Sequence, residues 1–355
     1  MTSCDNNIAK YILPQLASIE KNCKNYDVHF FLFHNRISPE NINMIKVFIK
    51  QCTHITFHEV KIQDIAHYEN IAECGGQWPF EAYFTIRVQD HIPEDVDRIL
   101  YIDAGDVIFA GDIAPYYFDD FEGKSILATA IAFKENRISG KNEIYTIDDA
   151  NSLGGRSLFN SGSYVINVEK FRTNGYTMYD YLCLALKLCE RAKEKSEPEL
   201  PYFGDQGLLS TVFAGDIKYF GYPQIRDLSY MPYNFRSSYW GLYRSHLSYT
   251  PVILHYAIIA KPWIMRFSPD IIDTVIASPD FPLNHVSVES VSVPLIAYLT
   301  PQHCKLCEMW WEYAKDTPIY EEADLKAKIS ADFFLKFYIP LFNDFNMATA
   351  REGAC

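Results

Sequence analysis

The sequence predicts an α/β fold with a mostly parallel sheet flanked by helices, and two observations lead to it. Apolar, strand-like runs alternate with segments of helical periodicity through the first half of the chain, as in successive βαβ units. Several runs are continuously apolar, which is typical of parallel strands buried on both faces. From about Pro294 the pattern changes to helices rich in Trp, Tyr and Phe. We therefore expect an α/β domain over residues 1–290 and a helical, aromatic-rich C-terminal extension over residues 291–355.

The helices are predicted in chain order from periodicity and capping signals. Apolar residues recur at helical spacing over residues 7–23, although Pro14 lies within this segment. Ser38 and Pro39 form a typical N-cap and first residue for a helix that ends near residue 52. The other two helices predicted before the extension cover residues 80–91 and 176–195.

The strands are predicted from short apolar or alternating runs. These runs are residues 28–33, 54–60, 99–102, 125–131, 164–167 and 252–256. The polar stretch 134–156 is expected to be a loop. No first strand is evident, because Met1 is followed almost at once by Asp5 and the first predicted helix. Either that strand is missing from this chain or it is supplied differently.

The composition argues against a nucleic-acid partner. Lys and Arg total 32, Asp and Glu total 45, and the formal net charge is −13, whereas a general nucleic-acid binder carries a basic face. No apolar stretch reaches the roughly 18 residues of a transmembrane helix, and the N-terminus has no signal-peptide core. Nine scattered cysteines favour reduced thiols in a cytoplasmic protein. Cys304 and Cys307 have CxxC spacing without the second pair of a zinc site, so we interpret them as helix-face residues.

Two carboxylates follow the strand 99–102, namely Asp103 and Asp106, with Gly105 between them. Ligands of open α/β sheets bind beyond the carboxyl ends of strands, and Mg²⁺ or Mn²⁺ held there usually also binds substrate phosphates. Taken alone, the pair is equally compatible with solvated turn carboxylates. Acids at i and i+2 of an extended segment share a face, but acids at i and i+3 do not. If both acids bind one cation, Gly105 must form a bulge or tight turn that returns Asp106 toward it.

Amides next to glycines mark two further candidate segments. Asn160 and Gly162 precede the strand 164–167, and a glycine turn there would let the Asn160 amide approach a sugar hydroxyl. Ordinary turn chemistry at a strand entry is the alternative. Asp205 and Gln206 open an apolar run, so Asp205 could equally be a helix cap.

The last candidate segment combines a histidine with a lysine. His255 lies in the strand 252–256, and Lys261 follows six residues later. Lys261 could reach a phosphate as a point charge. A single histidine near a strand end is more often structural than a metal ligand, so this segment gains weight only beside the others.

Together these segments resemble the retaining glycosyltransferases of family 8, which use UDP-sugars and include lipopolysaccharide galactosyl- and glucosyltransferases. The resemblance covers roughly residues 3–320. The segments that carry it, in the family's order and approximate spacing, are Ser3-Cys-Asp-Asn-Asn7 with Ala17-Ser-Ile19, the strand end 101–106, Phe159-Asn-Ser-Gly162, Asp205-Gln206, and His255-Tyr256 through Lys261-Pro-Trp263. The resemblance implies a Rossmann-like nucleotide-diphospho-sugar transferase fold, with residues 1–290 as its nucleotide-sugar-binding catalytic domain.

The resemblance also implies roles for the candidate residues. Asp103, Asp106 and His255 would bind one Mn²⁺ (or Mg²⁺) that bridges the diphosphate of a UDP-sugar donor. The residues implied to contact the donor are Lys261 at the diphosphate, Asp5 at the uracil, Asn6 and Arg87 elsewhere on the donor, and Asn160, Asp205 and Gln206 at the sugar.

The chain departs from the family pattern in four places. The usual Asp-x-Asp is Asp-Ala-Gly-Asp, one residue longer. Ile8 replaces an aromatic residue, so stacking on the base should be weaker. The Arg expected in the helix 80–91 falls at Thr85, with Arg87 two residues later, and Ile258 replaces a glycine. These changes affect the assignments of the metal site and the donor class less than the assignment of the sugar.

Retention of configuration requires either a nucleophile on the far side of the sugar or attack from the same face as the leaving group. A carboxylate is the expected nucleophile for the covalent route, but the family places Gln206 there, and an amide is a poor nucleophile. We therefore favour same-face attack with Gln206 stabilising positive charge at the anomeric carbon, and Asp205 is the next candidate for a covalent role.

The predicted function is therefore metal-dependent transfer of a hexose, glucose or galactose, from a UDP-sugar to a glycan or lipopolysaccharide-type acceptor. Two alternatives are a catalytically inactive sugar-nucleotide-binding protein and a metal-dependent nucleotidyltransferase or phosphatase. The latter would want more carboxylates or a phosphate-binding loop, which the sequence lacks. Trp310, Trp311 and Trp263 could form an acceptor-binding or lipid-facing surface at the inner face of a membrane, although an aromatic helix face is more often core. The acceptor and the oligomeric state are left open.

Overall fold

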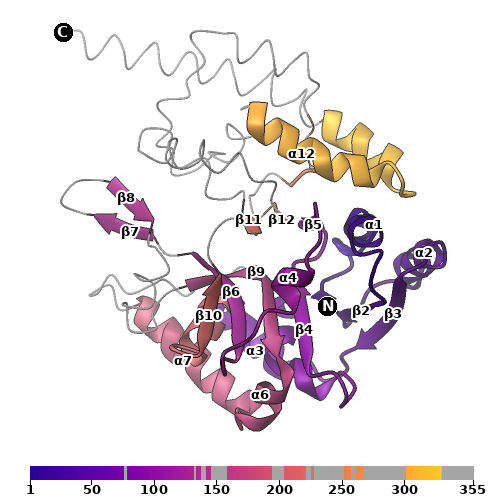
Figure 1. The fold of residues 1–355 in the computed structure, drawn as a ribbon. Helices are drawn as coiled ribbons and strands as arrows, with labels where there is room; N and C mark the ends of the chain where they lie inside the picture. Colours follow the sequence, from indigo (N-terminus) through magenta and orange to yellow (C-terminus); the bar gives the residue numbers. More distant parts are fainter. Residues whose placement is uncertain are drawn as a thin grey trace, which may run out of the picture. The chain divides into compact units, whose positions relative to one another are not determined.

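The structure of the protein is a computed structural model. The residues that it describes are 1–75, 78–131, 133–136, 141–144, 158–193, 204–220, 225–227, 252–256, 261–264, 266 and 301–329. The chain forms two compact units. The first comprises Met1–Arg226 with Pro251–His255, and the second comprises Asp227–Thr250 with Tyr256–Cys355. The first unit holds the large sheet and all but one of the labelled helices among the described residues (Figure 1).

Two groups of strands make up the large sheet. The parallel strands β1 (Thr2–Ser3), β2 (Val28–His34) and β3 (Ile55–Lys61) lie in the order β1-β2-β3. The second group contains β4 (Arg98–Ile102), β6 (Ile126–Ile131), β9 (Leu158–Asn167) and β10 (Ile217–Phe220), in the order β10-β6-β9-β4. Strand β9 runs antiparallel to β4 and β6, whereas β10 is parallel to β6. The sheet is therefore mixed rather than mostly parallel at this end.

The first strand is present and connects the two groups. The Met1 amino group donates to Leu100 O at 2.6 Å, and Ile102 N donates to Met1 O at 3.0 Å. Because β1 pairs with β2 on its other side, the strands run β3-β2-β1-β4, the order of a doubly wound nucleotide-binding half. The expectation that the first strand could be missing was wrong. A strand of two residues is too short to produce a periodic signal.

Helices cover both faces of this sheet. One layer contains α3 (Ala66–Gly75), η2 (Phe80–Asp90), α6 (Val168–Thr173), α7 (Met178–Lys193) and α8 (Gly204–Val212). Their apolar side chains pack with alternate strand residues such as Phe31, Tyr101 and Tyr164. The segments η1 (Ala9–Tyr11), α1 (Ile12–Asn22), α2 (Pro39–Ile49) and α4 (Ala114–Tyr117) contribute no residue to that cluster. Successive side chains of a strand point to opposite faces of the sheet, so only alternate strand residues face this cluster.

Several predicted boundaries differ from the structure for local reasons. The α-helix predicted over 7–23 begins only at Ile12, so Pro14 lies in its first turn, where a missing N–H is harmless. Ser38 caps α2 as predicted, with its Oγ accepting from Asn41 N at 3.3 Å. Helix α3 was not predicted. The stretch 134–156 is not entirely a loop, because β7 (Phe133–Asn136) pairs with β8 (Lys141–Ile144).

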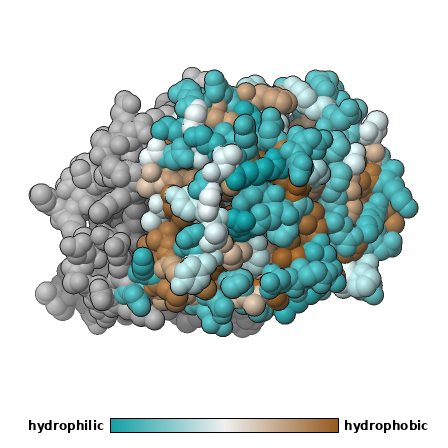
Figure 2. Space-filling model, turned by 90° about the horizontal axis from the view of Figure 1, so that it is seen from below, coloured by the Kyte–Doolittle hydropathy of each residue, from teal (hydrophilic) through white to brown (hydrophobic). Residues whose placement is uncertain are grey.

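The described surface is mixed. Figure 2 shows one face on which hydrophilic residues predominate and apolar residues form patches between them. Among the described residues, no helix is long and apolar enough to cross a membrane.

In the second unit, the tryptophans of the C-terminal extension are core residues. Helix α12 spans Pro301–Ala314 and a further helix spans 320–329. Trp310 and Trp311 are buried, and Trp263 packs against Trp310 with ring centroids 5.5 Å apart. Of the two interpretations of these tryptophans, the core is confirmed, and the acceptor-binding or lipid-facing surface is wrong for these three side chains. Cys304 and Cys307 lie in α12, as expected of helix residues.

Candidate metal and donor site

The Asp-Ala-Gly-Asp segment is a tight loop between two strands. Strand β4 ends at Ile102, and β5 (Val107–Phe109) begins one residue after Asp106. Gly105 has a φ of +73°, so the left-handed turn predicted from the extra residue is present. A Cβ on Gly105 would lie 3.0 Å from Tyr11 Cβ and 3.1 Å from Tyr11 O. The loop therefore needs glycine both for its backbone conformation and for its close approach to η1.

Helix α1 holds this loop and β5 through one polar face. Gln15, Ser18 and Asn22 lie at positions i, i+3 and i+7, which share a helix face. The Gln15 Nε2 donates to the carbonyl oxygens of Asp103 at 2.8 Å and Val107 at 3.0 Å. Ser18 Oγ accepts from the N–H of residue 109 at 3.0 Å, and Asn22 Nδ2 donates to the carbonyl of residue 109 at 2.8 Å. None of these three was a predicted site residue, but polar side chains at this spacing in an apolar helix were the available signal.

His255 reaches the two aspartates because its strand pairs with β5. Strand β12 (Ile253–His255) is antiparallel to β5, with His255 opposite Val107. His255 is 3% exposed, and its Nε2 lies 3.2 Å from Asp103 Oδ2. The other carboxylate oxygen of Asp103 accepts from the Tyr101 hydroxyl at 3.0 Å. Burial, with a smaller contribution from the charge of Asp103, raises the pKa of Tyr101 well above its usual value, so this phenol keeps its proton and donates.

Gly162 makes room for the imidazole. A Cβ there would lie 2.0 Å from His255 Cε1 and 2.4 Å from Nε2. The expectation of a glycine turn before a strand at 164 was wrong, since β9 begins at Leu158 and Gly162 lies within it. Pairing of β9 with β6 is interrupted between Phe159 and Tyr164. On the other side of β9, Gly162 O accepts from Asp103 N at 3.0 Å, which continues the β4–β9 ladder by one residue. The close approach to the Gly162 backbone that the sequence predicted is thus present, but the approaching group is the His255 imidazole.

Asp103, Asp106 and His255, the three ligands expected from the sequence, lie close enough together to hold one metal ion. Each offers one ligand atom, and these atoms all lie within 4.8 Å of one another. The two carboxylates suit Mn²⁺ or Mg²⁺, the imidazole adds a nitrogen ligand that transition metals accept more readily than Mg²⁺ does, and Gly162 leaves space for the imidazole. The residues present therefore fit a divalent cation.

Asp205 and Gln206 lie in the first turn of α8, beside β9. Gln206 Oε1 accepts from Ser161 N at 3.3 Å, which ties the amide to the strand that carries Gly162. Asp205 is buried, and burial raises its pKa to about 8, with the charge of Asp103 as the second cause. Asp205 is therefore protonated at neutral pH in the absence of a cation. The backbone of Asn160 lies in β9, whereas its side chain lies outside the described part of the chain.

Asp5 and Asn6 follow the carboxyl end of β1. Asp5 Oδ1 accepts from the backbone N–H groups of Asn7 at 2.9 Å and Ile8 at 3.1 Å, so the carboxylate organises the turn into η1. Asn6 Oδ1 accepts from Ser38 N at 2.8 Å, next to the start of α2. Both residues lie at the strand end where a nucleotide binds in doubly wound sheets. Their contact with uracil stays a prediction.

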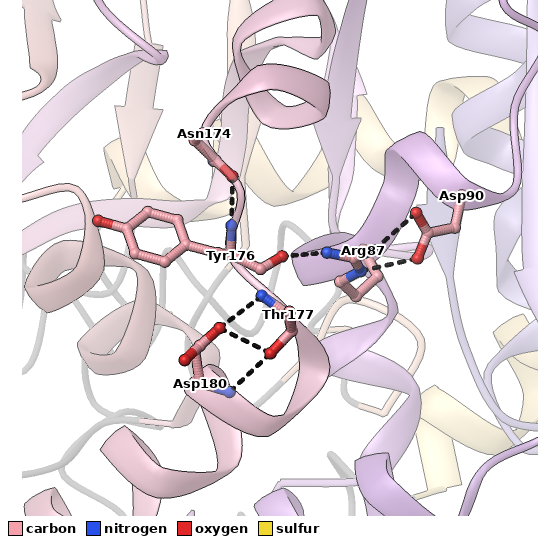
Figure 3. A network of polar contacts seen from close by, with 6 residues as sticks. All are labelled: Arg87, Asp90, Asn174, Tyr176, Thr177 and Asp180. Atoms are coloured by element: carbon pink, nitrogen blue, oxygen red, sulfur yellow. Dashed lines mark hydrogen bonds and ion pairs between the residues drawn. The ribbon is translucent and has the colours of Figure 1, made fainter.

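Arg87 belongs to a separate network between η2 and the start of α7 (Figure 3). Its guanidinium pairs with both carboxylate oxygens of Asp90, at 2.7 and 2.8 Å, and donates to Tyr176 O. Thr177 and Asp180 cap α7 reciprocally, since Thr177 N donates to the Asp180 carboxylate at 2.8 Å and Asp180 N donates to Thr177 Oγ1 at 3.3 Å. The described contacts of Arg87 thus connect η2 to the start of α7, and its contact with the donor stays a prediction.

Lys261 belongs to the second unit, where its Nζ donates to Tyr256 O at 3.0 Å. The segment after it is anchored by Arg266, which pairs with Glu308 of α12 at 2.7 Å and with Asp324 at 2.6 Å. The Arg266 guanidinium also lies over the ring of Trp311, 4.7 Å from its centroid. Contact of Lys261 with a diphosphate stays a prediction, and Ile258 lies outside the described residues.

A family model described as glycosyl transferase family 8 matches residues 1–265. Among solved structures, the chain is similar to the galactosyltransferase LgtC in complex with donor and acceptor sugar analogues, with 20% identity, a TM-score of 0.53, and coverage of 74% of this chain and 88% of that one.

An active-site mutant of LgtC gives 18% identity, a TM-score of 0.55, and coverage of 89% and 95%. The bifunctional glycosyltransferase WbbM gives 14% identity and a TM-score of 0.58, with coverage of 93% of this chain but only 51% of WbbM. No curated protein gives a significant match to the chain. At these identities the structural similarities establish the fold, and the family model establishes the family.

Proposed function

Because the chain belongs to glycosyl transferase family 8 and is therefore a glycosyltransferase, we propose that it transfers glucose or galactose from a UDP-sugar with retention of configuration. The acceptor would be a glycan or a lipopolysaccharide-type glycolipid. One observation carries the metal and donor assignment: the ligand atoms of Asp103, Asp106 and His255 converge within 4.8 Å at the carboxyl end of β4. That is where phosphate-bearing ligands bind in sheets of this kind.

The three ligand residues would hold Mn²⁺ or Mg²⁺ against the donor's diphosphate. When bound there, the cation supplies electrostatic stabilisation of the negative charge that develops on the leaving diphosphate. The Tyr101 hydroxyl orients one oxygen of Asp103 by donating to it, and the buried His255 is held by β12. Lys261 would add a positive charge at the diphosphate.

The neighbouring α8 residues would act on the sugar. Gln206 is oriented by Ser161 N, and its neutral amide is a poor nucleophile. The pKa of Asp205, raised to about 8 mainly by burial, makes this carboxyl a weak nucleophile at neutral pH. Both features favour same-face attack by the acceptor over a covalent intermediate. Gln206 would then stabilise the positive charge that develops at the anomeric carbon in the transition state.

The donor is also proposed to contact Asp5, Asn6, Arg87 and Asn160. Asp5 and Asn6 support this assignment by their position at the end of β1, the strand next to β4 in the sheet. Arg87 would have to exchange at least one of its present partners, Asp90 and Tyr176, for the donor. A glycolipid acceptor would place the enzyme at the cytoplasmic face of a membrane.

The direct experiment incubates the full chain with UDP-glucose, UDP-galactose and their N-acetyl forms, with Mn²⁺ or with EDTA. Slow release of UDP from one hexose donor, in the absence of any acceptor and only with metal, is the expected result. A shift in melting temperature by UDP without any turnover would instead favour the inactive sugar-nucleotide-binding alternative. Equal turnover in EDTA would reject the proposed metal dependence.

A further inference from the structure

The extra residue in Asp-Ala-Gly-Asp poses a positional problem for a metal site. An additional residue between two acids lengthens the backbone path and rotates the second side chain away from the first. The positive φ of Gly105 explains how the chain turns. A turn alone does not determine how far apart the two ends of the loop lie, however, and metal ligands tolerate only about 0.2 Å of error.

A single side chain bridges both ends of this loop. Gln15 is fully buried, and its Nε2 donates to the carbonyl oxygen of Asp103, at 2.8 Å, and to that of Val107, at 3.0 Å. A primary amide nitrogen carries two N–H donors, so one group satisfies the residue before the extra turn and the residue after it. Asp106 lies between these two bonds in the sequence and is constrained by them.

Three other contacts described for this loop each act at one of its ends. Asp103 N donates to Gly162 O at 3.0 Å, and the Tyr101 hydroxyl donates to the Asp103 carboxylate at 3.0 Å. Beyond the loop, Val107 pairs with His255 in the β5–β12 ladder. Gln15 therefore joins the Asp103 end to the strand that also positions the third ligand.

We propose that Gln15 is the positioning residue that adapts the four-residue Asp-Ala-Gly-Asp loop to metal binding, by setting the separation of Asp103 and Val107 and hence the place of Asp106. This inference rests on the metal role proposed above. It assigns to α1 a function that the family motif does not contain, because the loop is one residue longer than the family's usual Asp-x-Asp. Gln15 itself touches no reacting atom, and its effect passes through the aspartates.

The test compares two isosteric changes on the same helix face. Gln15→Met removes both N–H donors to the loop while keeping the side chain's length. Asn22→Leu is the matched control, because the Asn22 amide donates at 2.8 Å to the carbonyl of Phe109, in the same strand but beyond the loop. Mn²⁺ affinity is measured by calorimetry on the full chain, and melting temperature is measured in EDTA, where only the structural effect contributes.

Gln15→Met is expected to weaken Mn²⁺ binding by about 10- to 100-fold, the usual effect of losing a group that orients metal ligands. Asn22→Leu should lower the melting temperature comparably and leave Mn²⁺ affinity within about threefold. Gln15→Asn, one methylene shorter, keeps an amide that cannot reach both carbonyls. If Gln15→Met folds poorly, Gln15→Asn replaces it in the test, with the same expected loss of Mn²⁺ affinity. Unchanged Mn²⁺ affinity in a folded Gln15 variant, or an equal loss in Asn22→Leu, would overturn the inference while leaving the metal site intact. Absence of Mn²⁺ binding by the unaltered protein would reject the proposed function itself.

Discussion

Replacing Gly162 with alanine should displace His255 from the proposed metal site without changing the chemistry of any proposed ligand. The added Cβ would lie 2.0 Å from His255 Cε1 and 2.4 Å from Nε2. Ordinary carbon contacts are about 3.5–4.0 Å, so the imidazole must move by more than about 1 Å. The backbone of β9 has little freedom to yield instead, because Gly162 O accepts from Asp103 N and the next residue, Ser163, pairs with Ile102.

The magnitude follows from the tolerance of metal coordination. A ligand displaced by more than about 1 Å no longer coordinates, since metal sites tolerate about 0.2 Å. Loss of groups that merely orient ligands costs about 10- to 100-fold in metal affinity. Loss of His255 as one of three protein ligands should therefore cost at least about 100-fold, which is about 3 kcal/mol of binding free energy.

The assay is Mn²⁺ titration by calorimetry, with Gly111→Ala as the matched control. Gly111 follows β5, and a Cβ there would lie 3.2 Å from Val252 Cγ1, a side-chain atom that can yield. This control disturbs the same β5–β12 pair without approaching the imidazole. Adding Gly162→Ala to His255→Ala should weaken Mn²⁺ binding no further, because both changes act on one ligand. Wild-type Mn²⁺ affinity in a folded Gly162→Ala protein would refute the placement of His255 in the site.

Three further predictions concern the loop and the donor side. Gly105→Ala and Gly215→Ala both place alanine at a positive φ, +73° and +78°, so each should lose about 1 kcal/mol or more of stability. Only Gly105→Ala should also lower Mn²⁺ affinity, because its Cβ would contact Tyr11. Asp205 has its pKa raised by burial from 3.8 to about 8, so the fold binds this proton more tightly than the unfolded chain, and stability should fall as the pH rises through that interval. Thermal denaturation in EDTA should therefore show Asp205→Asn gaining stability relative to the unaltered protein between about pH 5 and about pH 9; a constant difference would contradict the buried acid. Gln206→Ala should lower kcat much more than it raises KM, by steady-state kinetics with the active donor, and an unchanged kcat would remove Gln206 from the mechanism.

Much of the fold follows from local patterns that the sequence displays openly. Continuous apolar runs predicted β2, β4 and β6, and the Ser38-Pro39 cap predicted α2, because burial and capping leave their signals in adjacent residues. Strand β1 left no such signal. Its two residues form a strand only through hydrogen bonds to segments that are distant in the sequence.

The candidate site, like the fold, has features that the sequence predicted and features that it did not. The types and order of Asp103, Asp106 and His255 predicted a metal-ligand set, and the residue count between the acids predicted the left-handed turn at Gly105. Their convergence depends on the β5–β12 pairing, a long-range contact with no local pattern. Gln15 was missed although it shares a polar helix face with Ser18 and Asn22, because that spacing indicates a contact face but not which backbone groups it contacts.

The most direct test of the account is calorimetric binding of UDP to the full chain with Mn²⁺ and with EDTA, for the unaltered protein and for Asp103→Asn. If Asp103, Asp106 and His255 hold the cation that binds the donor's diphosphate, the unaltered protein should bind UDP with Mn²⁺ and lose that binding in EDTA. Asp103→Asn should bind UDP weakly in both conditions, with a nearly unchanged melting temperature in EDTA. Equal UDP affinity in Mn²⁺ and in EDTA, or full Mn²⁺-dependent affinity in Asp103→Asn, would contradict the account.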